Sequence, residues 1–260
     1  NIDKSQNTNI FLGYEIINFK EEGEFIDISI KNLKDNKLLK IKTKFLIACD
    51  GSESFIRSKL KIDLIDLKYN KEWVIVDISL QDSYELDKVV RYICDPERPT
   101  IFTSLPNDKV RIEFQLLAGE NITEIMNGNE YIKFISPLLR DKKYQVDRVY
   151  IYRYRGNCAK ELRRKNIFLL GDAAHQIPPF AGQGLSSALR DASNLCWKIA
   201  HVISNQSNDK ILDTYQIERT EEIKNSIDSS IALGKLIDSL SVAFKGNTPL
   251  EEAIPPEARE

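Results

Sequence analysis

The densest group of residues that could do chemistry lies within positions 166–187. A short apolar run, Ile167–Leu170, leads directly into Gly171 and Asp172. Open α/β sheets bind ligands at the carboxyl ends of their strands, so a carboxylate here could accept hydrogen bonds from sugar or ribityl hydroxyls. The alternative is that Asp172 only caps the turn that follows it.

The same segment then provides the start of a long helix. Pro178-Pro179 favours an extended chain, and Gly182-Gln183-Gly184 precedes an amphipathic stretch. Glycines let a backbone approach a flat ring closely, and the free N–H groups of a helix start carry partial positive charge. A strand-end carboxylate and such a helix start can hold two parts of one long cofactor. The alternative, a plain turn, does not explain why these residues occur together.

A second candidate segment begins with the apolar run 45–49, which is typical of a strand buried on both faces of a parallel sheet. The run ends at Asp50-Gly51, and Ser54 and Arg57 follow one helical turn apart. Side chains at that spacing share one helix face and could contact phosphates. The alternative is a strand, turn and helix with an exposed arginine.

Both segments resemble the flavin-contacting motifs of FAD-dependent aromatic hydroxylases, the flavoprotein monooxygenases that include p-hydroxybenzoate hydroxylase. A third stretch, Cys94–Thr100, resembles one in hydroxyphenylpropionate-type hydroxylases, although its Asp95-Pro96 is also a turn signal. The resemblance covers about residues 8–240. It implies FAD contacts at Asp50, Gly51, Arg57, Gly171, Asp172, Pro179, Gly182, Gln183, Gly184, Leu185 and Ser186.

The resemblance implies a monooxygenase that uses NAD(P)H and O2 to hydroxylate a small phenolic or aromatic substrate, with the bound FAD performing the oxidation. A phenol reacts best after losing its proton, so a tyrosine or histidine relay is expected. Tyr92, Tyr152 and Tyr154 are candidates, although strand alternation places the last two on one face, where core packing is the alternative. His175 is expected to be structural, and the general base is not identified.

One part of the family pattern is missing. The family begins with a strand, turn and helix carrying Gly-x-Gly-x-x-Gly, which cradles the FAD pyrophosphate, whereas Gly13, Gly23 and Gly51 are isolated. We therefore expect this chain to be the later portion of a monooxygenase. It would hold FAD tightly only with an N-terminal segment, supplied in cis or as a separate chain.

Two alternatives stay open. The chain could be a truncated, non-catalytic remnant, or another FAD-dependent oxidoreductase on the same fold, such as a reductase or a halogenase. A halogenase would need a Trp-x-Trp-x-x-Pro run, and the isolated Trp73 and Trp197 argue against it.

The elements that must position these residues indicate an α/β (α+β) fold. We expect a partial FAD-binding Rossmann-like domain with a β-meander, and an inserted, mainly antiparallel β-sheet domain for the substrate. The cofactor domain would comprise residues 1–69 and 157–245, the substrate domain residues 70–156, and a loose tail residues 246–260.

Hydrophobic patterning predicts the individual elements. Strands are expected at 11–19, 24–32, 38–43, 45–49, 72–80, 88–94, 100–105, 110–117, 146–155 and 167–170, and helices at 52–60, 121–140, 185–203 and 211–240. The buried face of the helix after Leu185 is expected to consist of Leu185, Ala188, Leu189, Ala192, Leu195, Cys196, Ile199 and Ile203.

Composition excludes several classes of protein. The 260 residues carry a net charge of −2, so no field for nucleic acid or acidic membranes is evident. No apolar run approaches the roughly 18 residues of a membrane span. The four cysteines, Cys49, Cys94, Cys158 and Cys196, lack metal-site spacing, so we predict no metal and reduced thiols in a cytoplasmic protein.

Overall fold

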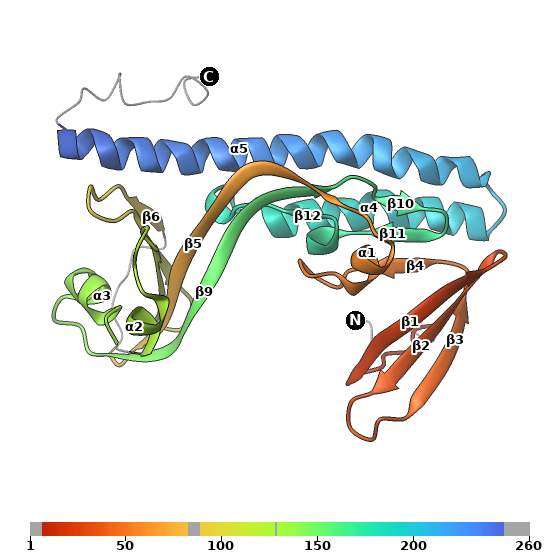
Figure 1. The fold of residues 1–260 in the computed structure, drawn as a ribbon, viewed down its shortest axis with the longest axis horizontal. Coiled ribbons are helices and arrows are strands. Elements are labelled where there is room, and N and C mark those ends of the chain that lie inside the picture. The colour runs from red at the N-terminus through yellow and green to blue at the C-terminus, as the bar shows by residue number, and fades with distance from the viewer. Residues whose placement is uncertain (1–6, 83–88, 128, 247–260) are drawn as a thin grey trace.

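The computed structural model describes residues 7–82, 89–127 and 129–246. Two long helices, α4 (Gln183–Ile203) and α5 (Asp213–Gly246), lie on one side of three sheets (Figure 1). Two long strands, β5 (Leu64–Leu80) and β9 (Tyr144–Ala159), pair along most of their length. They curve from the largest sheet toward α4, and so connect the two halves of the molecule (Figure 1).

The first sheet is the expected meander. Strands β1 (Tyr14–Glu22), β2 (Phe25–Asn32) and β3 (Leu38–Thr43) pair antiparallel in that order. Alternate residues of β2, namely Ile26, Ile28 and Ile30, are buried, as expected for a strand with one face on the core.

The second sheet brings the two candidate motifs together. Strand β4 (Leu46–Ala48) pairs parallel with β11 (Ile167–Leu169), which pairs antiparallel with β10 (Arg163–Arg164). Helix α1 (Phe55–Lys59) follows β4. The parallel strand is confirmed, but its burial on both faces was wrongly predicted, because Ile47 is 40% exposed. The described residues leave the outer face of β4 uncovered.

The third sheet has six strands, all paired antiparallel as predicted. Their order is β12 (His175–Gln176), β9, β5, β8 (Lys109–Gln115), β7 (Thr100–Leu105) and β6 (Val90–Ile93). One face packs on α2 (Ile122–Asn127) and α3 (Ile132–Leu139) through a core that includes Val76, Ile112 and Ile135. The single helix predicted at 121–140 is two helices, because Asn129 adopts a φ of 56°, which helical residues do not.

Helix α4 is present as predicted, but half of its predicted buried face is exposed. Leu185 is 75% exposed and Leu189 61%. The buried residues are Ser187, Asp191, Leu195, Lys198, Ile199 and Val202. The buried face is therefore a neighbouring stripe that contains charged residues, and apolar periodicity alone selected the wrong one.

Helix α5 approaches the rest of the chain closely at two glycines. A Cβ on Gly234 would lie 2.6 Å from the Phe180 ring, and one on Gly156 of β9 would lie 2.8 Å from Ile231. These glycines let α5 pack directly on β9 and on the loop that holds Phe180. Short 3₁₀ helices, η2 (Gly171–Ala173), η3 (Pro179–Ala181) and η4 (Asp209–Leu212), complete the connections.

The predicted mixed helix and strand fold is confirmed. The predicted domain division stays a prediction, and its boundaries near 69 and 156 fall inside the continuous strands β5 and β9. The predicted loose tail lies outside the described residues except for Gly246, which ends α5, and the predicted strand 88–94 is described from residue 89. None of the helices in the described ranges is long and apolar enough to cross a bilayer.

Candidate active site

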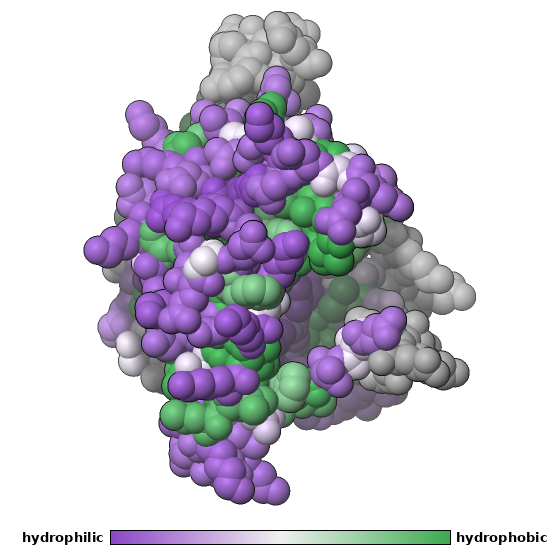
Figure 2. Space-filling model, turned by 90° about the vertical axis from the view of Figure 1, so that its right-hand side faces the viewer, coloured by the Kyte–Doolittle hydropathy of each residue, from purple (hydrophilic) through white to green (hydrophobic). Residues whose placement is uncertain are grey.

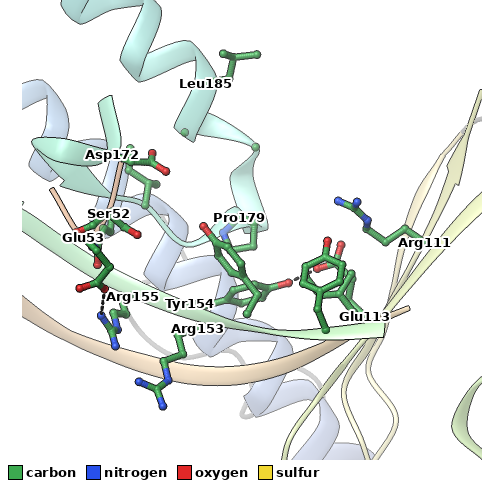
Figure 3. A pocket seen from close by; sticks show the side chains of 17 residues that line it. Ser52, Glu53, Arg111, Glu113, Arg153, Tyr154, Arg155, Asp172, Pro179 and Leu185 are labelled. Atoms are coloured by element: carbon green, nitrogen blue, oxygen red, sulfur yellow. Dashed lines mark hydrogen bonds and ion pairs between the residues drawn. The ribbon is translucent and has the colours of Figure 1, made fainter. Parts of the chain in front are cut away.

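A cavity of about 600 Å³ lies between the loop that follows β11 and the face of the six-stranded sheet opposite α2 and α3. This volume is within the range of about 300–1,000 Å³ common for small-molecule sites. Five of the predicted site residues line it, namely Asp172, Pro179, Gly182, Gly184 and Leu185. Figure 3 shows Asp172 and Leu185 on one side of this space and Arg111 and Glu113 on the strands beyond it.

Asp172 lies in η2, immediately after β11, and its side chain is exposed. The residue at the N-cap of η2 is Leu170, so the alternative in which Asp172 caps this turn does not apply. Among the described residues no hydrogen bond or ion pair of its carboxylate is recorded. The carboxylate is therefore available to a ligand in the cavity.

The start of α4 leaves room for a flat group. Its N-cap is Gly182, with a φ of 62° and no side chain to cap the helix. A Cβ placed on Gly182 or Gly184 would meet nothing within 4 Å. The first N–H groups of a helix have no partner within the helix, so this end offers donors and partial positive charge beside an open space.

The loop before α4 is held from two sides. The Tyr92 hydroxyl donates to the Phe180 carbonyl at 2.5 Å, and the Ser230 hydroxyl donates to the Pro178 carbonyl at 2.5 Å. The Phe180 ring packs edge-on against Trp73 and Tyr154 at 5.8 and 5.6 Å between centroids. The loop is therefore a fixed wall of the cavity, as its two prolines predicted.

Four further predicted residues do not line the cavity. Gly171 is buried, with its amide donating to Asp191, and Gln183 and Ser186 lie in the first turn of α4 without lining the cavity. Asp50 precedes Ser52 and Glu53, which line the cavity, and its carboxylate accepts from the Ser54 hydroxyl at 2.6 Å and the Ile56 amide at 3.0 Å.

Arg57 is buried between the two motifs. Its guanidinium donates to the carbonyls of Ala173 at 2.8 Å and Ser52 at 2.7 Å. Gly51 has a φ of 82° and makes the turn that brings Ser52 to this position. The exposed arginine of the alternative interpretation is thus not observed, and Arg57 fixes the two loops relative to each other.

His175 has a partner that its sequence neighbours did not reveal. Its Nε2 lies 2.7 Å from the Asp191 carboxylate, which also accepts from the Gly171 amide at 3.0 Å and from Arg219 at 2.8 Å. Burial opposes ionisation of Asp191, but the bonds and charges of these partners hold its pKa below the usual value. The group joins η2, α4 and α5 below the cavity, which supports the structural role expected for His175.

The sheet side of the cavity carries polar and aromatic residues, of which the sequence singled out Tyr152 and Tyr154 but not Tyr150, Arg111 or Glu113. Tyr150, Tyr152 and Tyr154 project from alternate positions of β9 and all line the cavity, together with Arg111 and Glu113 of β8. The Tyr154 hydroxyl donates to Glu113. Polar residues alternate with apolar ones along β8. From the sequence, this alternation could have indicated a strand with one polar face.

The site combines a carboxylate at a strand end, an open glycine-rich helix start and a facing aromatic sheet. This combination is typical of proteins that bind a long planar cofactor. The chain belongs to the FAD binding domain family, whose model matches residues 3–230. The residues at the cavity fit FAD, since Gly182 and Gly184 leave space for a ring and Asp172 is an unused acceptor.

The chain is also similar in sequence to curated hydroxylases. The chain is 30% identical over 237 residues to the 3-(3-hydroxy-phenyl)propionate/3-hydroxycinnamic acid hydroxylase of Escherichia coli K12, covering 91% of this chain and 42% of that one. It is 32% identical over 224 residues to the enzyme of the same name from Klebsiella pneumoniae, covering 86% and 40%. The chain therefore spans less than half the length of these curated relatives.

Solved structures share the fold. p-Nitrophenol 4-monooxygenase from Pseudomonas putida superimposes with a TM-score of 0.79 at 20% identity, over 94% of this chain and 63% of that one. Aklavinone-11 hydroxylase, solved with FAD and aklavinone, gives a TM-score of 0.79 at 21% identity, over 85% and 43%.

Proposed function

We propose that this chain is the substrate-facing portion of an FAD-dependent monooxygenase that hydroxylates a small phenolic ring with NAD(P)H and O2. One observation carries the proposal. The predicted flavin motifs and an aromatic, polar sheet face enclose the same cavity. The names of the relatives support a phenol with a short side chain as the substrate class.

Each part of the cavity has a task in this function. Bound FAD supplies the oxidising chemistry. Asp172 would accept hydrogen bonds from the ribityl hydroxyls of the bound FAD, and the N–H groups at the start of α4 would stabilise negative charge on its ring. Pro179 and the loop fixed by Tyr92 and Ser230 separate the reacting region from the core. The tyrosines of β9 provide a flat wall for an aromatic substrate.

The activity is tested with FAD-loaded protein that includes a pyrophosphate-binding segment. A phenolic acid such as 3-(3-hydroxyphenyl)propionate should stimulate NAD(P)H oxidation and O2 uptake, and mass spectrometry should detect a product one oxygen atom heavier. Flavin reduction without an oxygenated product for any phenol tested would favour the alternative of another FAD-dependent oxidoreductase. A protein that binds FAD in no form would favour the non-catalytic remnant.

The N-terminal segment belongs to the same proposal. Among the described residues β4 is an edge strand whose Ile47 is exposed, and Leu185 and Leu189 of α4 are exposed as well. Figure 2 shows hydrophobic side chains reaching the surface between hydrophilic ones at one end of the molecule. An unpaired strand beside exposed apolar residues is a surface that a further strand and helix would cover. We propose that a glycine-rich, pyrophosphate-binding segment occupies it.

Thiol labelling should detect this covering. Cys49 follows β4, Cys196 lies on α4, and both are exposed, whereas Cys158 is buried. In residues 1–260 alone we expect a thiol reagent to modify Cys49 and Cys196 rapidly and Cys158 slowly. In a chain extended by the glycine-rich segment, the first two should become protected. Equal labelling of both cysteines in the two chains would contradict the proposed position of the segment.

All four cysteines are free thiols in the structure. This agrees with a reducing compartment, and we propose that the protein acts in the cytoplasm.

Asp172→Ala should weaken FAD binding by about 1–2 kcal/mol, which is roughly 5- to 30-fold in the dissociation constant. This is the lower part of the range for hydrogen bonds to a charged group, because Asp172 is exposed. A flavin titration measures the effect, and Glu221→Ala, which removes an exposed carboxylate of α5, is the matched control. An unchanged dissociation constant for Asp172→Ala would show that this carboxylate does not contact the cofactor.

A further inference from the structure

The carboxyl group of Glu113 is the acidic group at the centre of the sheet face that borders the cavity. In β8, Glu113 pairs with Ile75 of β5, which in turn pairs with Tyr150 of β9. These three residues form one row across the sheet, and all three line the cavity. Figure 3 shows Glu113 directed toward Tyr154 from the strand that also carries Arg111.

One oxygen of this carboxyl group is held and the other is open. The Tyr154 hydroxyl donates to Oε2 of Glu113. The Tyr154 ring is itself fixed, since it stacks on Trp73 at 5.3 Å and 19° and meets Phe180 edge-on. In the described part of the chain no hydrogen bond to Oε1 is recorded. Glu113 therefore presents a positioned carboxyl oxygen to the cavity.

We propose that Glu113 accepts the proton of the substrate's phenolic hydroxyl, and that Tyr154 is the positioning residue that holds its carboxyl group in place. This proposal rests on the proposed hydroxylase function and adds the missing base to it. The phenolic O–H bond breaks, its electron pair stays on the phenolate oxygen, and the proton forms a bond to Oε1. The cavity exchanges one negative charge for another, so the transfer brings no additional charge into it.

The surroundings of Glu113 suit a proton acceptor. Burial raises the pKa of Glu113, whereas the hydrogen bond from Tyr154 and the charge of Arg111 lower it in part. Arg111 is itself paired with Asp77 at 2.7 Å, and Asp77 also binds Arg148. From the other strands the titratable groups that act on or face Glu113 are Asp77, whose charge also raises the pKa of Glu113, and Tyr92, Tyr150 and Tyr154. A carboxylate with a raised pKa is a stronger base than one in water, and it differs less in pKa from a phenol.

The test uses p-nitrophenol as a coloured probe of ionisation. It is added to FAD-loaded protein without NAD(P)H, so that no turnover occurs, at a pH below the pKa of the free probe. In the parent protein we expect a bound phenolate band without release of a proton to the medium, because Glu113 has taken it. In Glu113→Gln the intensity of the phenolate band should fall about tenfold, or the band should form with one proton released to the medium for each phenolate. Glu124→Gln, an exposed carboxylate of α2 behind the sheet, should behave as the parent.

Tyr154→Phe separates positioning from packing. The phenylalanine keeps the ring stack on Trp73 and removes only the hydrogen bond to Glu113. Because that bond favours the carboxylate, its loss raises the pKa of Glu113. At a pH below the pKa of the free probe, the ratio of bound phenolate to bound phenol should then rise about tenfold for each unit by which the pKa of Glu113 rises. A purely structural role for Tyr154 would leave this ratio unchanged.

Two results would overturn the assignment. One is a parent protein that binds the probe and releases a proton for each phenolate formed, and the other is a Glu113→Gln variant with an unchanged band and no proton release. If the protein hydroxylates phenols but gives either result, the proposed function stands and only the role of Glu113 is rejected. If the protein binds no phenol, both proposals are rejected.

Discussion

Replacing Gly184 by valine is expected to weaken FAD binding by about a hundredfold or more, roughly 3 kcal/mol. The effect should come from the ligand and not from the fold. A Cβ on Gly184 would meet nothing within 4 Å in the protein, and Gly184 is not among the residues with positive φ. The branched side chain would instead occupy the space in which the flavin ring must approach the backbone.

Ser193→Val is the matched control for this experiment. Ser193 is an exposed residue of the same helix, away from the cavity, so it measures the small cost of a β-branched residue in α4. Both variants should unfold at nearly the parent temperature, whereas only Gly184→Val should lose bound flavin. Parent-like flavin content in Gly184→Val would mean that the start of α4 faces another part of the cofactor, or none.

The cofactor side of the cavity was predictable because its residues are contiguous in sequence. Within about twenty residues, the apolar run before Asp172 sets the end of the strand, the two prolines set the loop, and Gly182 and Gly184 set the start of α4. Local rules are sufficient for such a segment. The structure places Asp172 and Gly184 on one cavity, as that spacing indicated.

The substrate side was not predictable in the same way. Glu113 meets Tyr154 because β8 and β9 both pair with β5, and these residues are 41 positions apart in the chain. The strands themselves were predicted, but their order in the sheet was not. A single sequence shows which residues of a strand share one face. Which residues of other strands they contact depends on the pairing register, which the sequence alone does not show.

Helix α4 shows a second limit. Its sequence contains two stripes, one apolar and one that includes Asp191 and Lys198, and hydropathy favoured the apolar stripe. The polar stripe is nevertheless buried, because Arg219 and Glu218 of α5 pair with those two residues. A buried charge is tolerated when its partner arrives from another element, and nothing near Asp191 in sequence announces that partner.

Asp191→Ala should lower the free energy of unfolding by about 3–5 kcal/mol, the effect usual when one partner of a buried ion pair is removed. Asp191 is fully buried and serves three donors, the Gly171 amide, the His175 ring and the Arg219 guanidinium. Without it, the positive charge of Arg219 stays in the core unpaired, and the turn that carries Asp172 loses its attachment to α4. Urea denaturation followed by circular dichroism measures the change.

The pH dependence distinguishes this ionic contribution from packing. The pKa of Asp191 is lower in the folded chain than its ordinary value, so its contribution is complete above the unfolded pKa, about 3.9, and is lost as pH falls through the lower folded value. The difference in stability between the parent and Asp191→Asn should therefore be largest near neutral pH and shrink on acidification. Glu218→Gln, which breaks the more exposed pair with Lys198, should cost less at neutral pH. A difference for Asp191→Asn that stays constant down to strongly acidic pH would show that the side chain stabilises the fold by shape and hydrogen bonding, and not by its charge.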